Sequence, residues 1–248
     1  AWLVLVIFGF QIGMSFAQIY GEQLRYQDMG YDLWSVTTGV YTGMRGILPP
    51  IQRYIYLYIP LITMGLMSRE YQSGSIKLLY SSPVKNTSII MGKFLSMMVY
   101  GVVLIGVLGV FVIFSAITIV NFDYPLVLSG MLGLYLLILA YSAIGLFMSS
   151  ITKYQVVAAI GTLAVLAVLN FIGDVGQDYD LVRHITYWLS ITGRAYPFID
   201  GLVASNNIFY FLIVIGFFLA LSILKLNTEK TIMPLKIKVL KYSGIIFV

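Results

Sequence analysis

Residues with the chemistry for catalysis are few in this chain, and they form no recognisable constellation. The single histidine, His184, cannot build a histidine-based metal site alone. The glycine-rich G-x-x-x-x-G-K-[ST] loop that cradles nucleotide phosphates does not occur. Three aspartates, Asp174, Asp178 and Asp180, could bind a cation, but their spacing is not that of a calcium loop. We therefore expect no catalytic, metal-binding or cofactor-binding residue in this chain.

Charged residues are also missing from the middle of the long apolar runs. A charge inside a membrane is costly, and ion-coupled carriers keep a working carboxylate there. A proton-driven carrier is therefore disfavoured. The runs also lack a Ser/His pair, an Asp/Asp pair or a metal-ligand set, which argues against an intramembrane enzyme.

The most distinctive polar stretch, residues 69–84, lies between two apolar runs and reads REYQSGSIKLLYSSPV. Ile76 and Leu79 are three residues apart, so they share one face if the segment is helical. Glu70 stands near the start of that helix, where the helix dipole favours an acid. Gly74 interrupts the segment or permits close backbone approach, and Pro83 ends it, because the residue before proline avoids the α region. The pattern predicts a short cytoplasmic helix, interrupted or closely approached at Gly74 and held between two membrane spans.

Two plainer interpretations of this stretch remain. Short membrane-protein loops rich in Lys and Arg stay on the cytoplasmic side, and most of them are only solvated connections. Ile76 and Leu79 could also rest on the bilayer surface or on neighbouring spans.

The composition predicts the class of protein that must position these residues. Of the 248 residues, 60% are hydrophobic and 10% are charged, against about 25% charged in soluble domains. The mean hydropathy is +0.93, and several uncharged runs approach 20 residues, the length of a membrane-spanning helix. The chain is therefore predicted to be an all-α integral membrane protein. Cysteine is absent, which excludes a disulfide framework.

Six apolar runs define the expected membrane domain, residues 1–226. A basic cytoplasmic linker is expected at 227–241, and the start of a seventh span at 242–248. Because the chain begins and ends inside apolar runs, we expect it to be a piece of a longer polypeptide. The six spans are predicted at about 1–20, 47–67, 94–120, 126–149, 154–172 and 208–226.

The distribution of charge predicts the orientation. With the N-terminus inside, all the lysines and Arg69 fall on the cytoplasmic side, whereas the other arginines and all acids except Glu70 and Glu229 fall outside. The outer segment 173–207 is acidic yet rich in aromatic and aliphatic residues, so it is predicted to form interfacial or re-entrant helices.

Two helix faces are candidates for contact with a second permease half or for the wall of a path. Gly9, Gly13 and Ala17 are spaced by four, and small residues let helices approach closely in lipid. In the fifth run, polar residues share one third of the helix circumference. For the first run, packing within the chain is at least as good an explanation. The residues assigned to the dimer seam or path are Gly9, Gly13, Ala17, Gln155, Thr162 and Asn170.

Three segments together resemble the ABC-2 type transporter permeases. The first is Glu70 followed by Gly74-Ser75, Leu78-Leu79 and Pro83-Val84; the family more often has Thr at position 75 and an acid at position 77, which is Lys77 here. The second runs from Ala140 to Ser150 and on to Gln155, and the third from Phe198 to Phe211. Within the family, the chain is most similar to gliding-motility-type permeases of Bacteroidetes.

The resemblance implies a six-span ABC-2 transmembrane domain, like that of type V ABC exporters, with a cytoplasmic coupling helix and outer re-entrant helices. It implies docking on two cytoplasmic ABC ATPase chains, which would carry ATP and Mg, and pairing with a second permease half, identical or not. The coupling residues it implies are Glu70, Gly74, Ile76, Leu79 and Pro83.

Two functions follow as hypotheses. The first is the transmembrane permease subunit of an ATP-driven transporter in the bacterial inner membrane, in contact with membrane lipid and with no nucleic acid. The alternative is a structural subunit that anchors a gliding-motility or envelope complex and transports nothing. The composition does not separate them; ATPase activity stimulated by a candidate substrate would favour the first.

Overall fold

A computed structural model describes residues 2–28, 36–43, 46–82, 84–119, 122–174, 186 and 189–245; for residues 23, 24, 26–28, 36, 174 and 230–245 it describes the backbone alone. Within these residues the protein is all-helical, without a strand. The helices are α1 (Trp2–Asp28), α2 (Val36–Tyr41), α3 (Leu48–Thr63), α4 (Ser68–Ser73), α5 (Ile76–Ser81), α6 (Asn86–Thr118), α7 (Tyr124–Ile151), α8 (Gln155–Phe171), the 3₁₀ turn η1 (Ile172–Asp174), α10 (Ile191–Ile199) and α11 (Ser205–Ile245).

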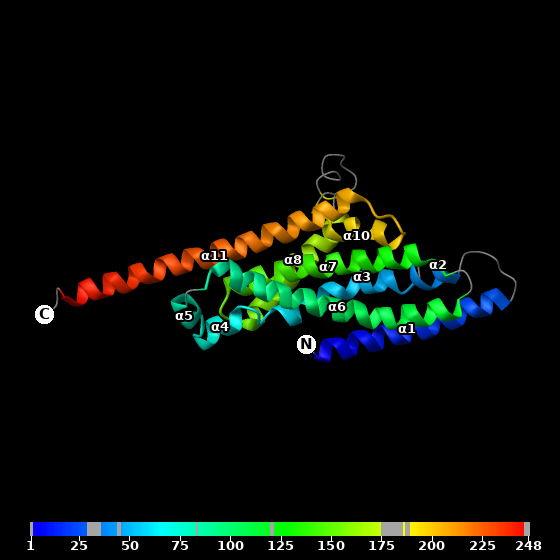
Figure 1. Cartoon of the computed structure of the whole chain (residues 1–248), viewed down its shortest axis with the longest axis horizontal. Helices are drawn as coiled ribbons and strands as arrows, with labels where there is room; N and C mark the ends of the chain where they lie inside the picture. The colour runs from blue at the N-terminus through cyan, green and yellow to red at the C-terminus, as the bar shows by residue number, and fades with distance from the viewer. Residues whose placement is uncertain are drawn as a thin grey trace.

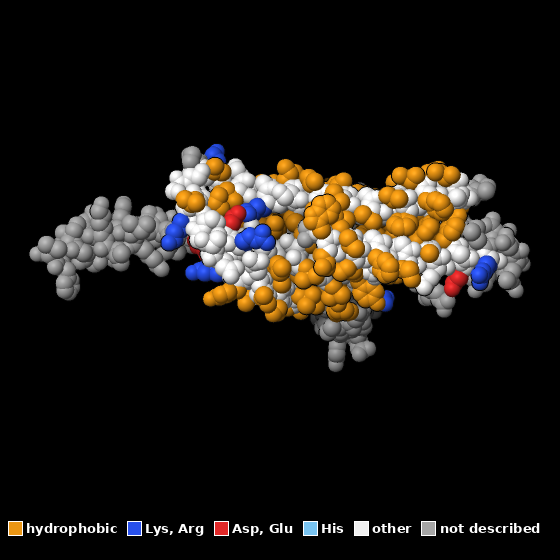
Figure 2. All heavy atoms as spheres, turned by 90° about the horizontal axis from the view of Figure 1, so that it is seen from below, with side chains coloured by type: hydrophobic (Ala, Val, Ile, Leu, Met, Phe, Trp, Pro, Cys, Tyr) orange, Lys and Arg blue, Asp and Glu red, His pale blue; other side chains and the backbone are white. Residues whose placement is uncertain are grey.

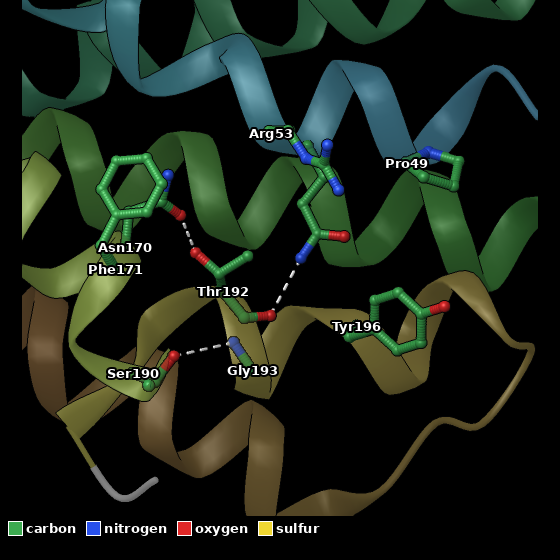
Figure 3. Close-up of a pocket in the computed structure, with 10 residues that line it drawn as sticks. Pro49, Arg53, Asn170, Phe171, Ser190, Thr192, Gly193 and Tyr196 are labelled. Atoms are coloured by element: carbon green, nitrogen blue, oxygen red, sulfur yellow. Dashed lines mark hydrogen bonds between the residues drawn. The ribbon is translucent and has the colours of Figure 1, made fainter. Parts of the chain in front are cut away.

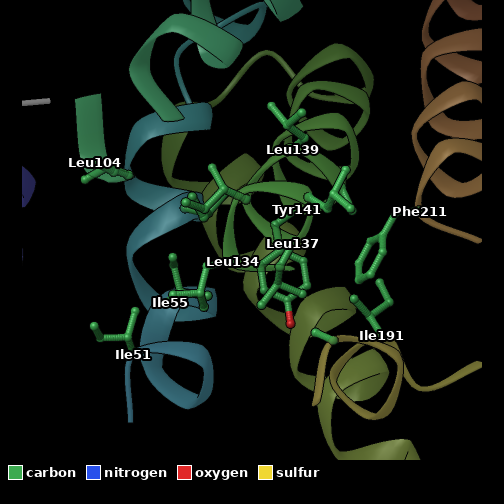
Figure 4. Close-up of a cluster of buried hydrophobic side chains, with 14 of the residues drawn as sticks. Ile51, Ile55, Leu104, Leu134, Leu137, Leu139, Tyr141, Ile191 and Phe211 are labelled. Atoms are coloured by element: carbon green, nitrogen blue, oxygen red, sulfur yellow. The ribbon is translucent and has the colours of Figure 1, made fainter. Parts of the chain in front are cut away.

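The long helices run side by side, with α4 and α5 at one end of the bundle and α2 at the other (Figure 1). Helix α7 is the central element and packs against α3, α6, α8, α10 and α11. Side chains from these surrounding helices meet the inner faces of α7 around Leu134, Leu137 and Tyr141 (Figure 4). The run at 126–149, predicted as the fourth span, therefore forms the central helix of the molecule.

Glycines on α7 allow its neighbours to approach closely. A Cβ atom at Gly130 would lie 2.5 Å from Leu48 Cδ1 of α3. A Cβ at Gly133 would overlap Phe198 of α10, and one at Gly145 would overlap the Thr63 side chain of α3. Since small residues bring helix backbones together in lipid, these glycines shape the packing of α3 and α10 on α7.

Among the residues that the structure describes, four helices are long and apolar enough to cross a membrane: α1 over Trp2–Glu22, α6, α7, and α11 over Ser205–Glu229. Helix α8 has 17 residues and α3 has 16, so both are shorter than the roughly 20 residues that a helix needs to cross a membrane. The chain is thus a multi-pass helical membrane protein. Six spans remain a prediction.

The surface agrees with a membrane setting. Apolar side chains form a broad band along the middle of the molecule, and charged side chains lie toward its two ends (Figure 2). The band includes exposed residues of α1 and α6 such as Phe10, Val110 and Ile117. A soluble monomer rarely exposes so large an apolar surface, whereas lipid contact explains it.

Several helix boundaries differ from the predicted spans: α1 continues to Asp28, past the predicted end at about 20, and α3 ends at Thr63, before the predicted end at about 67. The third predicted span begins at residue 94, but α6 already begins at Asn86. The more polar residues 86–93 form its first two turns. The predicted linker 227–241 is part of α11, which runs unbroken from Ser205 to Ile245. Residues 246–248, where a seventh span was expected to continue, lie outside the described residues.

The segment 173–207, predicted to lie outside, contains the helix α10; its interfacial or re-entrant character stays a prediction. Helix α10 is no free loop, since Ile191, Ala195, Phe198 and Ile199 are buried against the bundle. Ser190 caps its start by accepting a hydrogen bond from the Gly193 backbone N–H at 3.1 Å. His184, Asp178 and Asp180 lie outside the described residues, as does the side chain of Asp174.

Candidate functional site

The predicted docking stretch forms two six-residue helices, α4 and α5, joined by a sharp corner at Gly74. We call residues 68–81 the α4–α5 unit. Gly74 has a φ of 75°, in the left-handed region that favours glycine. Its N–H donates to the Tyr71 carbonyl, which closes the end of α4. The predicted interruption at Gly74 is therefore present, and a Cβ there would meet no atom within 4 Å.

The face shared by Ile76 and Leu79 points into the protein. Ile76 is only 4% exposed and belongs to the hydrophobic core, and Leu79 is partly buried against that core. In the isolated chain these two residues therefore rest on neighbouring helices, which is the alternative named above, and their role as apolar anchors for a partner stays a prediction. Their three-residue spacing placed them on one face, as expected, but that face packs on the chain itself.

Leu78 occupies the outward face that the sequence analysis overlooked. Its side chain is 73% exposed and has Lys77 and Ser81 as exposed neighbours on the same unit. On a helix, residues next to each other in sequence point about 100° apart, so burial of Ile76 and Leu79 directs Leu78 away from the core. The signal was present in the apolar pair Leu78-Leu79, whose members cannot share one face. Pro83 lies outside the described residues.

An ion pair joins the α4–α5 unit to α6. Glu70 Oε1 lies 2.6 Å from Lys93 Nζ, and Lys93 also donates to the Leu66 carbonyl at 2.5 Å. The other carboxylate oxygen of Glu70 is buried without a hydrogen-bond partner among the described residues. The basic partner expected for Glu70 on another chain is thus supplied within this chain, by Lys93.

A serine joins the unit to α7. The Ser149 hydroxyl accepts hydrogen bonds from the backbone N–H groups of Met67 and Ser68, at 2.9 and 3.0 Å, and donates to the Met64 carbonyl at 2.9 Å. All three backbone groups belong to the turn between α3 and α4, so one buried side chain fixes where α4 begins. Helix α4 lacks a side-chain cap of its own, and Ser149 takes over that task from another helix.

A carboxylate joins the unit to α11. Glu229 accepts hydrogen bonds from the hydroxyls of Tyr71 on α4, at 2.6 Å, and Tyr80 on α5, at 2.9 Å, and pairs with Lys225 at 3.1 Å. Burial raises the pKa of the Tyr80 phenol to about 12, and the Glu229 carboxylate acts in the same direction. Both phenols are therefore protonated donors at neutral pH. The carboxylate holds the two short helices to one point on α11.

A weaker contact reaches α8, where the Gln155 amide donates to the Gln72 side chain at 3.4 Å. The unit is thus bonded to four long helices, through Lys93, Ser149, Gln155 and Glu229. A displacement of the unit must therefore strain or move all four helices, because each bond joins a different helix to it.

The comparisons with known proteins assign the family. The model of the family described as "ABC-2 family transporter protein" matches residues 1–177, more than two thirds of the 248 residues. The chain belongs to the ABC-2 transporter family. No curated protein and no solved structure shows a significant match.

Membership in the ABC-2 family makes the chain a membrane permease subunit of an ABC transporter, a subunit that is not itself the catalyst. The matched region contains the α4–α5 unit, with its links to α6, α7 and α8. The finer likeness to gliding-motility permeases stays a prediction. The segment from Phe198 to Phe211 lies beyond the matched residues.

In this ABC-2 chain, the glycine stripe of α1 faces α6. A Cβ on Gly9 would lie 3.5 Å from Val107, and one on Gly13 would lie 3.6 Å from Phe111. Ala17 is exposed. Contact with α6 of the same chain is therefore observed at Gly9 and Gly13, and the assignment of these residues to a seam between permease halves or to a path stays a prediction.

The polar face of α8 is also internal to the ABC-2 chain. Thr162 is fully buried and bonds to the Ala158 carbonyl of its own helix at 2.7 Å. Asn170 is 9% exposed and accepts a hydrogen bond from Thr192 near the start of α10. Gln155 contacts the α4–α5 unit, so each of the three has a partner within this chain, and their assignment to a seam or path stays a prediction. The outward face of α8 is instead apolar, with Val156, Ile160 and Val168 exposed.

Proposed function

We propose that the chain is one half of an ATP-driven permease and that the α4–α5 unit docks on a separate ATPase chain. The observation that carries the proposal is the bonding of this unit to four long helices, which suits a part that must transmit movement. The exposed Leu78 offers an apolar contact on the side away from the bundle. ATP and Mg would bind to the ATPase, and this chain would convert its closure into movement of helices.

The proposed topology has six spans with the N-terminus inside, in the bacterial inner membrane. Helices α3 and α8 join the four longer spans, since both pack against α7 in the middle of the bundle. The α4–α5 unit then lies on the cytoplasmic side, in agreement with the positions of the lysines. Two such halves, identical or not, would pair around a path for the substrate.

Transmission of movement follows from the lengths of α4 and α5. Isolated helices of six residues are unstable, so the shape of the unit depends on its tertiary contacts. A partner that pushes on Leu78 therefore moves the Glu70–Lys93 pair and the Tyr71/Tyr80–Glu229 cluster together. In this way a movement imposed at one surface residue is passed to α6 and α11.

The test is a charge placed on the docking face. Replacing Leu78 with Asp should leave expression and membrane insertion unchanged, because this side chain contacts solvent. It should strongly deplete the ATPase that co-purifies with the tagged permease, since truncating a central interface residue alone costs about 2–4 kcal/mol. Mass spectrometry identifies the co-purifying chain, and ATP hydrolysis by the complex measures the loss.

The matched control is Ile151→Asp, at the end of α7, where the side chain is 49% exposed but outside the α4–α5 unit. This variant should retain the ATPase. Wild-type co-purification with Leu78→Asp, or equal loss with Ile151→Asp, would remove the unit from the docking role.

A further inference from the structure

A hollow opens between the start of α3, the end of α8 and the start of α10, at the end of the bundle away from the α4–α5 unit (Figure 3). Its volume is about 340 Å³. The walls come from three separate stretches of chain, and the floor is polar and buried. The lining residues are Pro49, Gln52, Arg53, Asn170, Phe171, Gly173, Ser190, Thr192, Gly193 and Tyr196.

The floor is held by a hydrogen-bond network. The Gln52 amide donates to the Thr192 carbonyl at 2.9 Å, and the Thr192 hydroxyl donates to the Asn170 carbonyl oxygen (Figure 3). Gln52 is 3% exposed and Ser190 is 4% exposed. Because buried polar groups keep their partners, this floor is a fixed surface across three helices.

Among the described residues, the hollow has unused donors on Asn170 and Ser190 and one unused side-chain acceptor, Gln52 Oε1. The NH₂ group of Asn170 and the hydroxyl proton of Ser190 have no acceptor among the described residues, since both side chains are seen only accepting. Arg53 is exposed and forms no ion pair in the described part of the chain. In the part of the lining that the structure describes there is no carboxylate. A surplus of N–H and O–H donors beside one fixed positive charge suits an oxyanion.

The surroundings of Arg53 indicate that the anion is carried on an acyl chain. Leu57 and Leu61 follow Arg53 at intervals of four, so the three share one face of α3. Both leucines are exposed, at 41% and 51%, and continue the apolar surface from the hollow toward the middle of the bundle. Phe171 and the ring of Tyr196 border the hollow and are also half exposed.

We propose that this hollow binds the phosphate of an anionic membrane lipid, with Arg53 pairing with the charge and the acyl chains lying over Leu57 and Leu61. The Asn170 amide and the Ser190 hydroxyl donate to the remaining phosphate oxygens. Such a lipid bridges α3, α8 and α10 from the membrane side. The site requires only that these helices lie in a bilayer, so it stands or falls independently of ATPase docking.

Native mass spectrometry of the full chain in detergent tests the proposal, with phosphatidylglycerol added at limiting concentration. Arg53→Gln should weaken retention of phosphatidylglycerol about tenfold, because a charge-assisted contact is lost. Arg53→Lys, which keeps the charge, should recover part of it. The control Arg69→Gln removes an exposed arginine from the α4–α5 unit and should bind as the wild type does. An unchanged melting temperature shows that the variants are folded.

A second arm separates the two sources of a phosphate. Glycerol phosphate, which has no acyl chain, should displace phosphatidylglycerol only at a much higher concentration. Displacement at equal concentration would identify a site for soluble oxyanions and overturn the lipid assignment. Equal lipid retention by the wild type and Arg53→Gln, or an equal loss with Arg69→Gln, would overturn the site itself.

Discussion

Helices α7 and α1 both have the length and hydropathy of a membrane span, yet they occupy opposite places in the fold. In the most apolar stretch of α7, 72% of the residues are buried inside the protein; in α1 the share is 22%. Their mean hydropathies over these stretches, 2.1 and 1.8, barely differ. Hydropathy therefore reports that a helix can leave water, but it does not report whether lipid or protein surrounds it.

The two helices differ in burial because their small and polar residues have different contacts. Gly145 of α7 touches the side chain of Thr63, and Ser149 bonds to three backbone groups of the preceding turn. On α1, Gly13 meets only the tip of the Phe111 ring at ordinary contact distance. Because lipid tails are as apolar as leucine, close fit and hydrogen bonds, and not hydrophobicity, decide which helix becomes central.

The largest effect is expected where α7 and α3 touch. Gly145→Leu should prevent folding, since even a Cβ at this position overlaps Thr63. Gly145→Ala should cost about 1–3 kcal/mol, the usual penalty for overpacking. Thermal unfolding in detergent, followed by size-exclusion chromatography, measures both variants.

Gly106 of α6 provides the control, because a Cβ there meets nothing within 4 Å. Gly106→Ala and Gly106→Leu should fold normally. Equal melting temperatures for the Gly145 and Gly106 variants would show that close packing does not distinguish α7 from the outer helices.

A smaller effect is expected at the polar contact between α7 and the α4–α5 unit. Ser149→Ala removes the acceptor of two buried backbone N–H groups, and an unsatisfied buried group costs about 1–3 kcal/mol. Ser96→Ala is the matched change, because Ser96 is exposed and bonds only to Gly92 of its own helix; it should shift stability by less than about 0.5 kcal/mol. The melting temperatures decide, and a shift in Ser96→Ala as large as in Ser149→Ala contradicts the distinction.

The smallest effect is expected on α1. Gly13→Ala adds a Cβ at 3.6 Å from Phe111, which is ordinary contact, and it removes the entropic cost of glycine in a helix, about 0.5–1 kcal/mol. Stability should stay equal or rise slightly, and the oligomeric state in mild detergent should not change. A loss of assembly in this variant would place Gly13 at a seam between permease halves.

The helices were predictable from the sequence because a long apolar run in a bilayer must satisfy its backbone hydrogen bonds within the run, and a helix does so. Helices α3, α6, α7, α8 and α11 overlap the runs from which they were expected. The break at Gly74 was also predictable, since glycine before a new apolar pattern marks a corner. The direction in which the face of Ile76 and Leu79 points was not predictable. Their spacing shows that they share a face, but the core on which that face packs is built from helices far along the chain.

The small-residue stripe of α1 shows the same limit. A stripe of small residues predicts that some helix approaches, but it does not say which one, and for Gly9 and Gly13 the neighbour is α6 of the same chain. The polar residues of α8 likewise point to partners, which proved to be Thr192 and Gln72. The hollow around Arg53 could not be predicted, because its walls come from stretches more than 100 residues apart.

The length of α11 has a mechanical consequence. At 1.5 Å per residue its 41 residues measure about 60 Å, roughly twice the thickness of the hydrocarbon core. With Ser205–Glu229 in the membrane, the helix would work as a lever with its fulcrum near the membrane surface, and Pro234, which lacks an N–H for the helix hydrogen bonds, is the point at which the lever would bend. If its embedded half tilts by about 10°, the far tip swings by about 5 Å, given about 30 Å of free helix. Glu229 lies close to that fulcrum, so a displacement of the α4–α5 unit by a fraction of this distance is amplified at the tip.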